Sequence, residues 1–363
     1  MPPIRLLVPG NIHHSSGGNI YNARLVAGLK ALGEDVEVVP VEGHWPTPGA
    51  RDRRRFGTLL GAWEPSLGPE KAVAVVDGLV AVGAPDELES AAGAGRETWI
   101  LEHMPLPETS DPASLAGEAR ALRAAAGVVC TSTWAATRLR ERGIAVSGVA
   151  LPGVEPAAEA PGSVPPHFAI VAALLPNKDQ LLAVEALALL QDLEWTAALV
   201  GSDQADPGYA GQVRATIVEK GLQERVRLVG EVTGQALEDQ WARTNLSLLV
   251  SRNEAFGMAV TESLARSIPV LVREGTGAVE ALSLAGLETA DGGPRLPGAA
   301  VALPEGGQES PRLLAGVLRR WLEDPECGAA WRAAARDARA RLPDWNRTAR
   351  TVLEVLAGPG GNG

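Results

Sequence analysis

Cysteine is scarce in this sequence of 363 residues, since only Cys130 and Cys327 occur, far apart in the chain. A disulfide framework and a zinc site both lack the residues that they need, which favours a reducing compartment. Apolar runs are also short, so neither a signal peptide nor a membrane span is predicted. We therefore expect the protein to stay where it is made, in the cytoplasm.

Basic residues are also fewer than acidic ones. Lys and Arg total 33 against 44 Asp and Glu, which gives a formal net charge of −11. A nucleic-acid-binding protein normally has a basic excess, so we expect no nucleic-acid partner. The same balance leaves at most peripheral contact with anionic membranes. Lysine occurs only at positions 30, 71, 178 and 220, so a lysine at a special position is informative.

The apolar residues that are present follow a strand–helix rhythm. The short run Ile4–Val8 and the later run Val36–Val39 flank a segment with helical apolar spacing. The rhythm restarts at Phe168–Leu174, after the Pro-, Ala- and Gly-rich stretch Glu155–Pro166, which we interpret as an interdomain linker. Because the length exceeds what one core usually serves, two Rossmann-like, doubly wound α/β domains are predicted.

The predicted domains are an N-terminal one over residues 1–158 and a C-terminal one over residues 159–342. Residues 343–357 are expected to form a final helix, and the Gly-rich residues 358–363 a disordered tail. Sheets of this kind bind ligands at the carboxyl ends of their strands. With two such domains, we expect the binding site in a cleft between them.

The segment Ser251–Glu262 places two carboxylates around a predicted helix start. A strand leads to Ser251, and a helix is expected to begin near Phe256–Gly257. Free N–H groups at a helix start suit a diphosphate. Glu254 would precede the helix, and Glu262, about two turns inside it, could accept both hydroxyl protons of a ribose. By itself this spacing is common, and two solvated Glu residues on a buried helix would look the same.

The wider context resembles glycosyltransferase family 4, the retaining GT-B enzymes. The segment NEAFGMAVTESLARSIPVLV is similar to that family's E-x-F-G-x-x-x-x-E followed by A-x-G-x-P-V-V. Thr276–Glu280 stands where the family has G-G-x-P-E, Gly17-Gly18 resembles its N-terminal glycine loop, and Trp345 resembles the Trp before its last helix. The resemblance covers almost the whole chain and implies a GT-B fold of two Rossmann-like domains facing a cleft. It also implies that the last helix crosses back to the N-terminal domain.

The resemblance also implies roles in donor binding. Glu254 would hold hydroxyls of the donor sugar, Glu262 the nucleotide ribose, and Lys178 the diphosphate. A cation after a strand end stabilises a departing nucleoside diphosphate on physical grounds as well. The family's usual Arg five residues before that Lys is Ala173 here, and Arg252, Arg273 or Arg24 could replace it. The backbone at four further residues would meet the diphosphate or the sugar: Ala255, Phe256, Gly257 and Met258.

In the N-terminal domain, His103 follows the predicted strand Thr98–Leu101. The resemblance implies that it touches the donor sugar near the reacting carbon, so we group it with Glu254 and Lys178 as catalytic. The alternative is a His hydrogen-bonded within its own turn. The glycine loop adds Gly17 and Gly18 as donor-binding candidates. Weaker candidates for acceptor binding are His13, His14, Asn19 and Ser132.

Other functional classes lack their motifs. No G-x-G-x-x-G follows the first strand, no Walker lysine motif is present, and Ser132 lacks a G-x-S-x-G elbow. We therefore predict a retaining hexosyl- or N-acetylhexosaminyl-type transferase that moves a sugar from a UDP- or GDP-sugar to a small-molecule or glycan acceptor. No metal or cofactor is expected, and the chain would be a monomer or homodimer. The alternatives are a catalytically weak nucleotide-sugar binding protein and a GT-B epimerase or phosphorylase.

Overall fold

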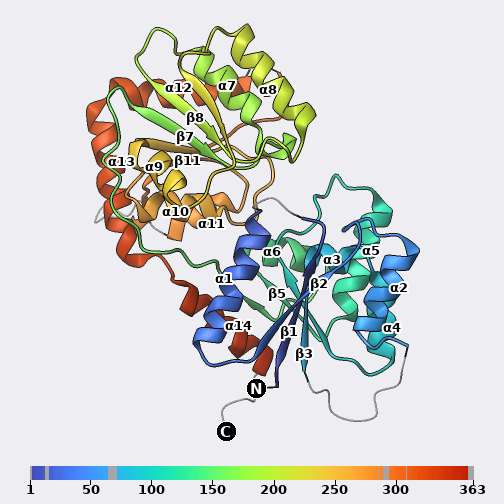
Figure 1. Ribbon diagram of the computed structural model, residues 1–363. Helices are drawn as coiled ribbons and strands as arrows, with labels where there is room; N and C mark the ends of the chain where they lie inside the picture. The colour runs from blue at the N-terminus through green and yellow to red at the C-terminus, as the bar shows by residue number, and fades with distance from the viewer. Residues whose placement is uncertain are drawn as a thin grey trace. The chain divides into compact units, whose positions relative to one another are not determined.

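The computed structural model describes residues 2–12, 16–63, 72–284, 286–288, 294–307 and 309–358. The chain divides into two compact units, whose strands and helices are drawn in Figure 1. The first unit comprises Met1–Gly153 with Pro343–Gly363, and the second comprises Val154–Leu342. The break after Gly153 comes slightly ahead of the predicted boundary at 158.

The first unit is built on a sheet of six parallel strands in the order β2-β1-β3-β4-β5-β6. Parallel neighbours require helical crossovers, which accounts for the strand–helix rhythm of the sequence. Helices α1 and α14 lie on one side of the sheet, and α2, α4 and α5 on the other (Figure 1). The strands are β1 (Ile4–Pro9), β2 (Val36–Val41), β3 (Val73–Asp77), β4 (Thr98–Glu102), β5 (Gly127–Cys130) and β6 (Gly148–Val149). The helices are α1 (Gly17–Ala31), α2 (Ala50–Leu59), α3 (Gly78–Val82), α4 (Pro85–Gly93), α5 (Pro112–Ala124), α6 (Thr133–Glu141) and α14 (Trp345–Ala357).

The second unit has its own six-stranded parallel sheet, in the order β14-β11-β10-β7-β8-β9. The strands of this sheet are β7 (His167–Val171), β8 (Thr196–Val200), β9 (Val226–Gly230), β10 (Leu246–Leu249), β11 (Val270–Arg273) and β14 (Gly298–Val301). The helices are η1 (Pro176–Lys178), α7 (Gln180–Ala188), α8 (Pro207–Glu219), α9 (Gln235–Arg243), α10 (Met258–Ala265), α11 (Ala278–Leu284), α12 (Glu309–Glu323), α13 (Pro325–Ala338) and η2 (Arg339–Arg341). A short antiparallel pair, β12 (Leu287–Glu288) and β13 (Pro294–Arg295), completes the unit.

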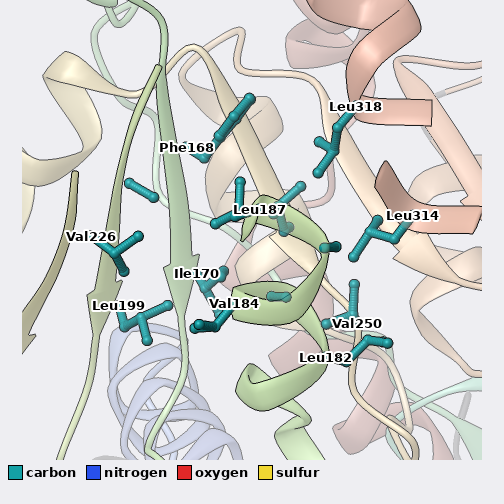
Figure 2. Packing of buried hydrophobic residues seen from close by; sticks show 14 of the residues in the cluster. Phe168, Ile170, Leu182, Val184, Leu187, Leu199, Val226, Val250, Leu314 and Leu318 are labelled. Atoms are coloured by element: carbon teal, nitrogen blue, oxygen red, sulfur yellow. The ribbon is translucent and has the colours of Figure 1, made fainter. Parts of the chain in front are cut away.

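Each sheet has its own hydrophobic core, because helices cover both faces of the sheet. In the second unit, Phe168 and Ile170 on β7 pack against Val184 and Leu187 on α7, with Leu314 of α12 beside them (Figure 2). These side chains are fully or almost fully buried. Burial on both faces accounts for the near-continuous apolar runs of the strands, which is typical of parallel sheets.

The stretch Glu155–Pro166, predicted to be a linker, packs along the second unit instead. The Ala160 amide donates to the Arg266 carbonyl at 3.0 Å, and the Gly162 amide to the Ala242 carbonyl at 2.9 Å. The Arg336 guanidinium pairs with Glu159 at 3.0 Å. A Pro- and Ala-rich composition therefore does not imply a free connection here, because backbone hydrogen bonds hold this extended segment in place.

The final helix, α14, belongs to the first unit. It packs closely on α1, where a Cβ added to Gly28 would lie 3.0 Å from the Cβ of Ala349. The Thr348 hydroxyl donates to the Leu151 carbonyl at 2.7 Å, and the Trp345 ring lies edge-on to Tyr21. Residues far apart in the sequence thus share one core in this unit.

Candidate active site

The second sheet has a topological switch point between its neighbouring strands β7 and β10. The chain leaves β7 toward α7 and β8 on one side, and leaves β10 toward α10 and β11 on the other. Ligands of open α/β sheets bind where two such loops diverge. Lys178 lies in the loop after β7, and Glu254 in the loop after β10. Their side chains meet there, with Lys178 Nζ 2.7 Å from Glu254 Oε2.

A second ion-pair group fixes the same two loops. The Arg252 amide donates to the Asn177 carbonyl at 2.7 Å. The Arg252 guanidinium donates to both carboxylate oxygens of Asp179, at 3.1 and 3.0 Å. Asp179 itself has a left-handed backbone, with φ 54°, which is uncommon for a residue other than glycine. The loop that bears Lys178 is therefore held in a strained conformation, because the Asp179 carboxylate forms ion pairs with both Arg252 and Arg273.

The sequence offers three candidates for the second cation, Arg252, Arg273 and Arg24. Their positions and burial in the structure distinguish between them. Arg273 is buried, and its guanidinium donates to the Val250 carbonyl at 2.9 Å, to the Leu303 carbonyl and to Asp179. Burial lowers the pKa of Arg273, and Asp179 opposes that shift. Arg24 lies on α1 in the first unit. Arg252 alone of the three lies in a switch-point loop with a half-exposed side chain.

Two glycines shape the loop that carries Glu254. Gly257 precedes α10 with φ 83°, and an added Cβ there would lie 2.8 Å from a Leu249 methyl group. The Gly277 amide donates to the Glu254 carbonyl at 2.7 Å. A Cβ on Gly277 would lie 1.8 Å from the Ala255 carbonyl oxygen, which no structure tolerates without movement. The backbone at 254–257 is therefore fixed by a close approach that only glycine permits.

Helix α10 begins at Met258, slightly later than predicted, with Gly257 as its N-cap. Glu262 is therefore the fifth residue of the helix, about one turn in rather than two. No side chain caps this helix start, so its first N–H groups suit an anion. The side chains of Ala255 and Phe256 are buried, so only the backbone of these residues could contact a ligand.

In the first unit, polar groups from three elements gather around His103, just after β4. Asp77 ends β3, and Asn22 lies on α1. His103 Nε2 lies 3.0 Å from Asn22 Oδ1 and 3.3 Å from Asp77 Oδ2. Asn22 Nδ2 donates to Asp77 Oδ2 at 2.7 Å. His103 is thus held by side chains from other elements of this unit and not by its own turn.

The charges around His103 shift the pKa of its neighbours. Burial alone would raise the pKa of Asp77, but His103, Asn22 and the Leu79 amide together hold it below its usual value. Glu102 is fully buried, and this burial, with Glu118 nearby, raises its pKa to about 8. Glu102 also accepts from the Met104 amide at 3.0 Å. Asp77 therefore stays ionised in the fold, while Glu102 holds its proton at neutral pH.

The remaining site candidates of the first unit do not belong to the group of polar side chains around His103. Ser132 is buried and caps α6 by accepting from the Ala135 amide at 2.9 Å, so its hydroxyl has a structural partner and is not displayed to a ligand. Asn19 donates to the Ile12 carbonyl at 3.3 Å. Gly17 and Gly18 open α1, and an added Cβ on Gly18 would lie 3.3 Å from His103 Cδ2. His13 and His14 lie outside the described residues.

Sequence reasoning missed three residues that position these sites. Asp77 and Asn22 hold His103, and Asp179 holds Arg252. Asp77 carried a usable signal, because it directly follows a buried strand and so lies at the ligand-binding edge of the sheet. Asn22 and Asp179 carried none, since their roles depend on contacts with distant segments.

Within the described ranges, no helix is long and apolar enough to cross a membrane. No cluster of three or more His, Cys, Asp or Glu side chains in the same ranges is arranged to hold a metal ion.

Comparison with solved structures defines the fold class. Sucrose-phosphate synthase from Thermosynechococcus elongatus superposes with a TM-score of 0.73 at 18% identity, covering 98% of both chains. HepE of Anabaena, solved in complex with UDP and glucose, superposes with a TM-score of 0.71 at 17% identity, covering 98% of this chain and 99% of that one. Together with the two parallel sheets, these matches place the protein in the GT-B fold class.

Residues 156–338, just over half of the chain, match the family model described as glycosyl transferases group 1. The chain belongs to this family. A D-inositol 3-phosphate glycosyltransferase from Jonesia denitrificans is 30% identical over 186 residues, which cover 50% of this chain and 40% of that protein. A lipopolysaccharide core mannosyltransferase, LpcC, from Rhizobium leguminosarum bv. viciae is 32% identical over 87 residues, covering 24% of each chain. These matches span less than half of the relatives' own length.

Proposed function

We propose that this protein is a retaining glycosyltransferase that moves a hexosyl or N-acetylhexosaminyl group from a UDP- or GDP-sugar to a small-molecule or glycan acceptor. The observation that carries the proposal is the pairing of Lys178 with Glu254 at the switch point of the second sheet. Family membership supports sugar transfer. In support of a nucleotide-sugar donor, HepE, which shares the fold, binds UDP and glucose in its solved complex.

The donor would bind to the second unit. The diphosphate would meet the uncapped N–H groups at the start of α10, where the helix dipole favours an anion. Glu262, one turn further along that helix, would accept hydrogen bonds from the ribose diol. Glu254 would accept from hydroxyls of the sugar, because its carboxylate lies just ahead of the helix.

Lys178 and Arg252 would stabilise the departing nucleoside diphosphate. Charge builds on the leaving phosphate as its bond to the sugar breaks, so cations already in place lower the barrier. Lys178 Nζ donates one hydrogen bond to Glu254, and its remaining N–H groups could meet phosphate oxygens. Arg252 would supply the second positive charge from the neighbouring loop, in place of the Arg absent at Ala173.

Retention would not use a nucleophile from the protein. Glu254 is held by the Lys178 ammonium at 2.7 Å, and a carboxylate neutralised in this way is a weak nucleophile. The departing phosphate would instead take the acceptor's proton on the same face of the sugar, as the family resemblance implies. The acceptor would bind to the first unit, near His103. No metal or cofactor is included in this scheme, and we propose a cytoplasmic location.

The test has two stages. Isothermal titration with UDP, GDP and ADP identifies the base, and the matching nucleotide sugar is then incubated with a panel of polyol and glycan acceptors. Proton NMR of the new anomeric centre shows whether configuration is retained. An inverted product contradicts retention, whereas nucleotide binding without transfer or slow donor hydrolysis favours a binding protein. Turnover that needs only free phosphate, or no acceptor, favours a phosphorylase or an epimerase.

A further inference from the structure

His103 lies within a three-residue arrangement in the first unit. Its Nε2 lies 3.0 Å from Asn22 Oδ1, and Asn22 Nδ2 donates to Asp77 Oδ2 at 2.7 Å. The other Asp77 oxygen, Oδ1, accepts from the Leu79 amide at 2.9 Å, as the N-cap of α3. The Leu79 amide therefore fixes the orientation of Asp77, Asp77 fixes that of Asn22, and Asn22 fixes that of the His103 ring.

The chemistry of these groups decides where the ring proton sits. An ionised carboxylate only accepts hydrogen bonds, so the nitrogen of the Asn22 amide must face Asp77. The oxygen of that amide then faces His103, and an amide oxygen also only accepts. Nε2 must therefore be the donor. In the neutral ring, Nδ1 then has no proton and presents a lone pair.

The protein covers one edge of the ring and leaves the other available. Gly18 packs on the Cδ2 side, where an added Cβ would lie 3.3 Å away, and Tyr21 lies edge-on with ring centroids 5.2 Å apart. Nδ1 is on the opposite edge, and among the described residues none forms a hydrogen bond with it. The His103 side chain is 17% exposed. His103 Nδ1 is thus a hydrogen-bond acceptor held in a fixed orientation at the carboxyl edge of the sheet.

We propose that Asp77 and Asn22 hold His103 as the Nε2–H tautomer, so that Nδ1 accepts a hydrogen bond from a hydroxyl group of the substrate bound at the first unit. The hydroxyl belongs to a sugar or a polyol, and in this respect the inference rests on the proposed function. Asp77 and Asn22 act as positioning residues through His103. The Asp77 carboxylate also stabilises positive charge that develops on the ring as the hydroxyl proton is shared.

The backbone on either side of His103 is held as well, which keeps the direction of Nδ1 constant. The His103 carbonyl accepts from the Thr131 hydroxyl at 3.3 Å. The Met104 amide donates to Glu102, and the Leu106 amide to Glu118 at 2.7 Å. Arg142 in turn pairs with Glu118. Orientation by a supporting shell of this kind is what a recognition group requires.

The tautomer is tested without any activity measurement. Ring nitrogen-15 shifts of the full-length protein, assigned by comparison with a His103→Asn variant, report which nitrogen carries the proton. In the neutral ring the proton is expected on Nε2, and in the double variant Asp77→Asn with Asn22→Leu, which removes both acceptors near Nε2, it is expected to redistribute toward Nδ1. A proton on Nδ1 in the wild type overturns the proposal. Because this readout needs no substrate, it stands even if the protein proves not to be a transferase.

The role of Nδ1 is tested by two substitutions that keep different halves of the imidazole. Asn places an amide near the position of Nδ1, and Gln places one near Nε2. His103→Asn is expected to lose less than tenfold in kcat/KM, and His103→Gln more than a hundredfold, both with unfolding midpoints close to that of the wild type. Equal losses, or a better-preserved Gln variant, overturn the assignment of Nδ1.

Asp77 needs a control for its second role as a helix cap. Asp77→Asn keeps a capping oxygen for α3 but removes the charge, and kcat is expected to fall about tenfold or more with KM little changed. Asp111→Asn is the matched control, because Asp111 caps α5 in the same unit by accepting from the Ser114 amide. An equal kcat in Asp77→Asn and Asp111→Asn shows that Asp77 is only a cap and contradicts its positioning role.

Discussion

Lys178 and Glu254 are 76 positions apart in the sequence, yet the ammonium nitrogen lies 2.7 Å from a carboxylate oxygen. Both side chains are largely buried, at 20% and 12% exposure. A pair of this kind loses more when one partner is removed than the pair contributes in total, because the other charge is left desolvated. The pair therefore couples the two loops of the switch point.

Replacing Lys178 by alanine is expected to reduce transition-state stabilisation by about 2–4 kcal/mol, as loss of one preorganised charge contact does. Steady-state kcat/KM with the nucleotide sugar measures the effect. Lys220→Ala is the control, since Lys220 is a partly exposed lysine of the same unit that pairs with its sequence neighbour Glu219. A loss under tenfold in Lys178→Ala would mean that another cation carries the leaving-group charge.

Substitutions of Glu262 and Glu254 are expected to affect different quantities, the first nucleotide affinity and the second kcat. Glu262→Ala should weaken nucleotide binding, because it removes the acceptor for the ribose hydroxyls. Glu254→Gln should mainly lower kcat, because it alters contacts with the sugar and frees Lys178 from its partner. Calorimetry with the nucleoside diphosphate and initial rates separate the two effects. Unchanged binding and unchanged rates in both variants contradict the site assignment.

Arg252 is expected to act as the second phosphate cation. Arg252→Gln should cost ~1.5–3 kcal/mol, or about 10–100-fold in kcat/KM, the range for hydrogen bonds to charged groups. Adding Ala173→Arg to that variant should recover part of the loss, because it returns a cation to the loop after β7. Arg214→Gln, which removes a surface pair with Asp203 in the same unit, is the control. No loss in Arg252→Gln argues against this role.

Gly277 is expected to tolerate no side chain. A Cβ at this position would lie 1.8 Å from the Ala255 carbonyl oxygen, so Gly277→Ala must displace the loop that carries Glu254. Overpacking of this kind costs about 1–3 kcal/mol, and nucleotide affinity should fall with stability. Gly211→Ala on α8 is the control, because no atom lies within 4 Å of its added Cβ, and it should stabilise the helix slightly. Urea unfolding and calorimetry compare the two variants.

Glu102 is expected to make stability depend on pH. Burial raises its pKa to about 8, so the folded protein holds a proton that the unfolded chain has lost above about pH 4.5. Stability from this group therefore falls as the pH rises toward 8, by about 1–2 kcal/mol between pH 6.5 and 8. Glu102→Gln should abolish that fall, because the amide stays neutral and still accepts from the Met104 amide. Urea midpoints at the two pH values measure it, with the exposed Glu97→Gln as control. An equal fall in Glu102→Gln and wild type would locate the effect elsewhere.

The architecture and the motif of the second unit could be predicted from the amino-acid sequence alone. Apolar runs buried on both faces, such as Ile4–Pro9 and Val270–Arg273, predict parallel strands, because only parallel sheets covered by helices bury both faces of a strand. The motif around Glu254 and Lys178 could be found from local spacing, since strand ends and helix starts are local features. The start of α10 was predicted one or two residues early, because Gly257 adopts a left-handed conformation and serves as the N-cap.

The contacts that hold the side chains of each site could be found only in the folded structure. The pairing of Asp179 with Arg252 and Arg273 joins three segments, and the orientation of His103 depends on Asp77 and Asn22 from two other elements. The sequence carries no periodicity for such contacts, because they depend on strand order and on which loops meet at one sheet edge. For the same reason Glu155–Pro166 could not be recognised as part of the second unit, since hydrogen bonds to distant backbone groups hold it there. The cap made by Ser132 is different, because it joins residues only three positions apart and a Ser before a helix start is a local signal.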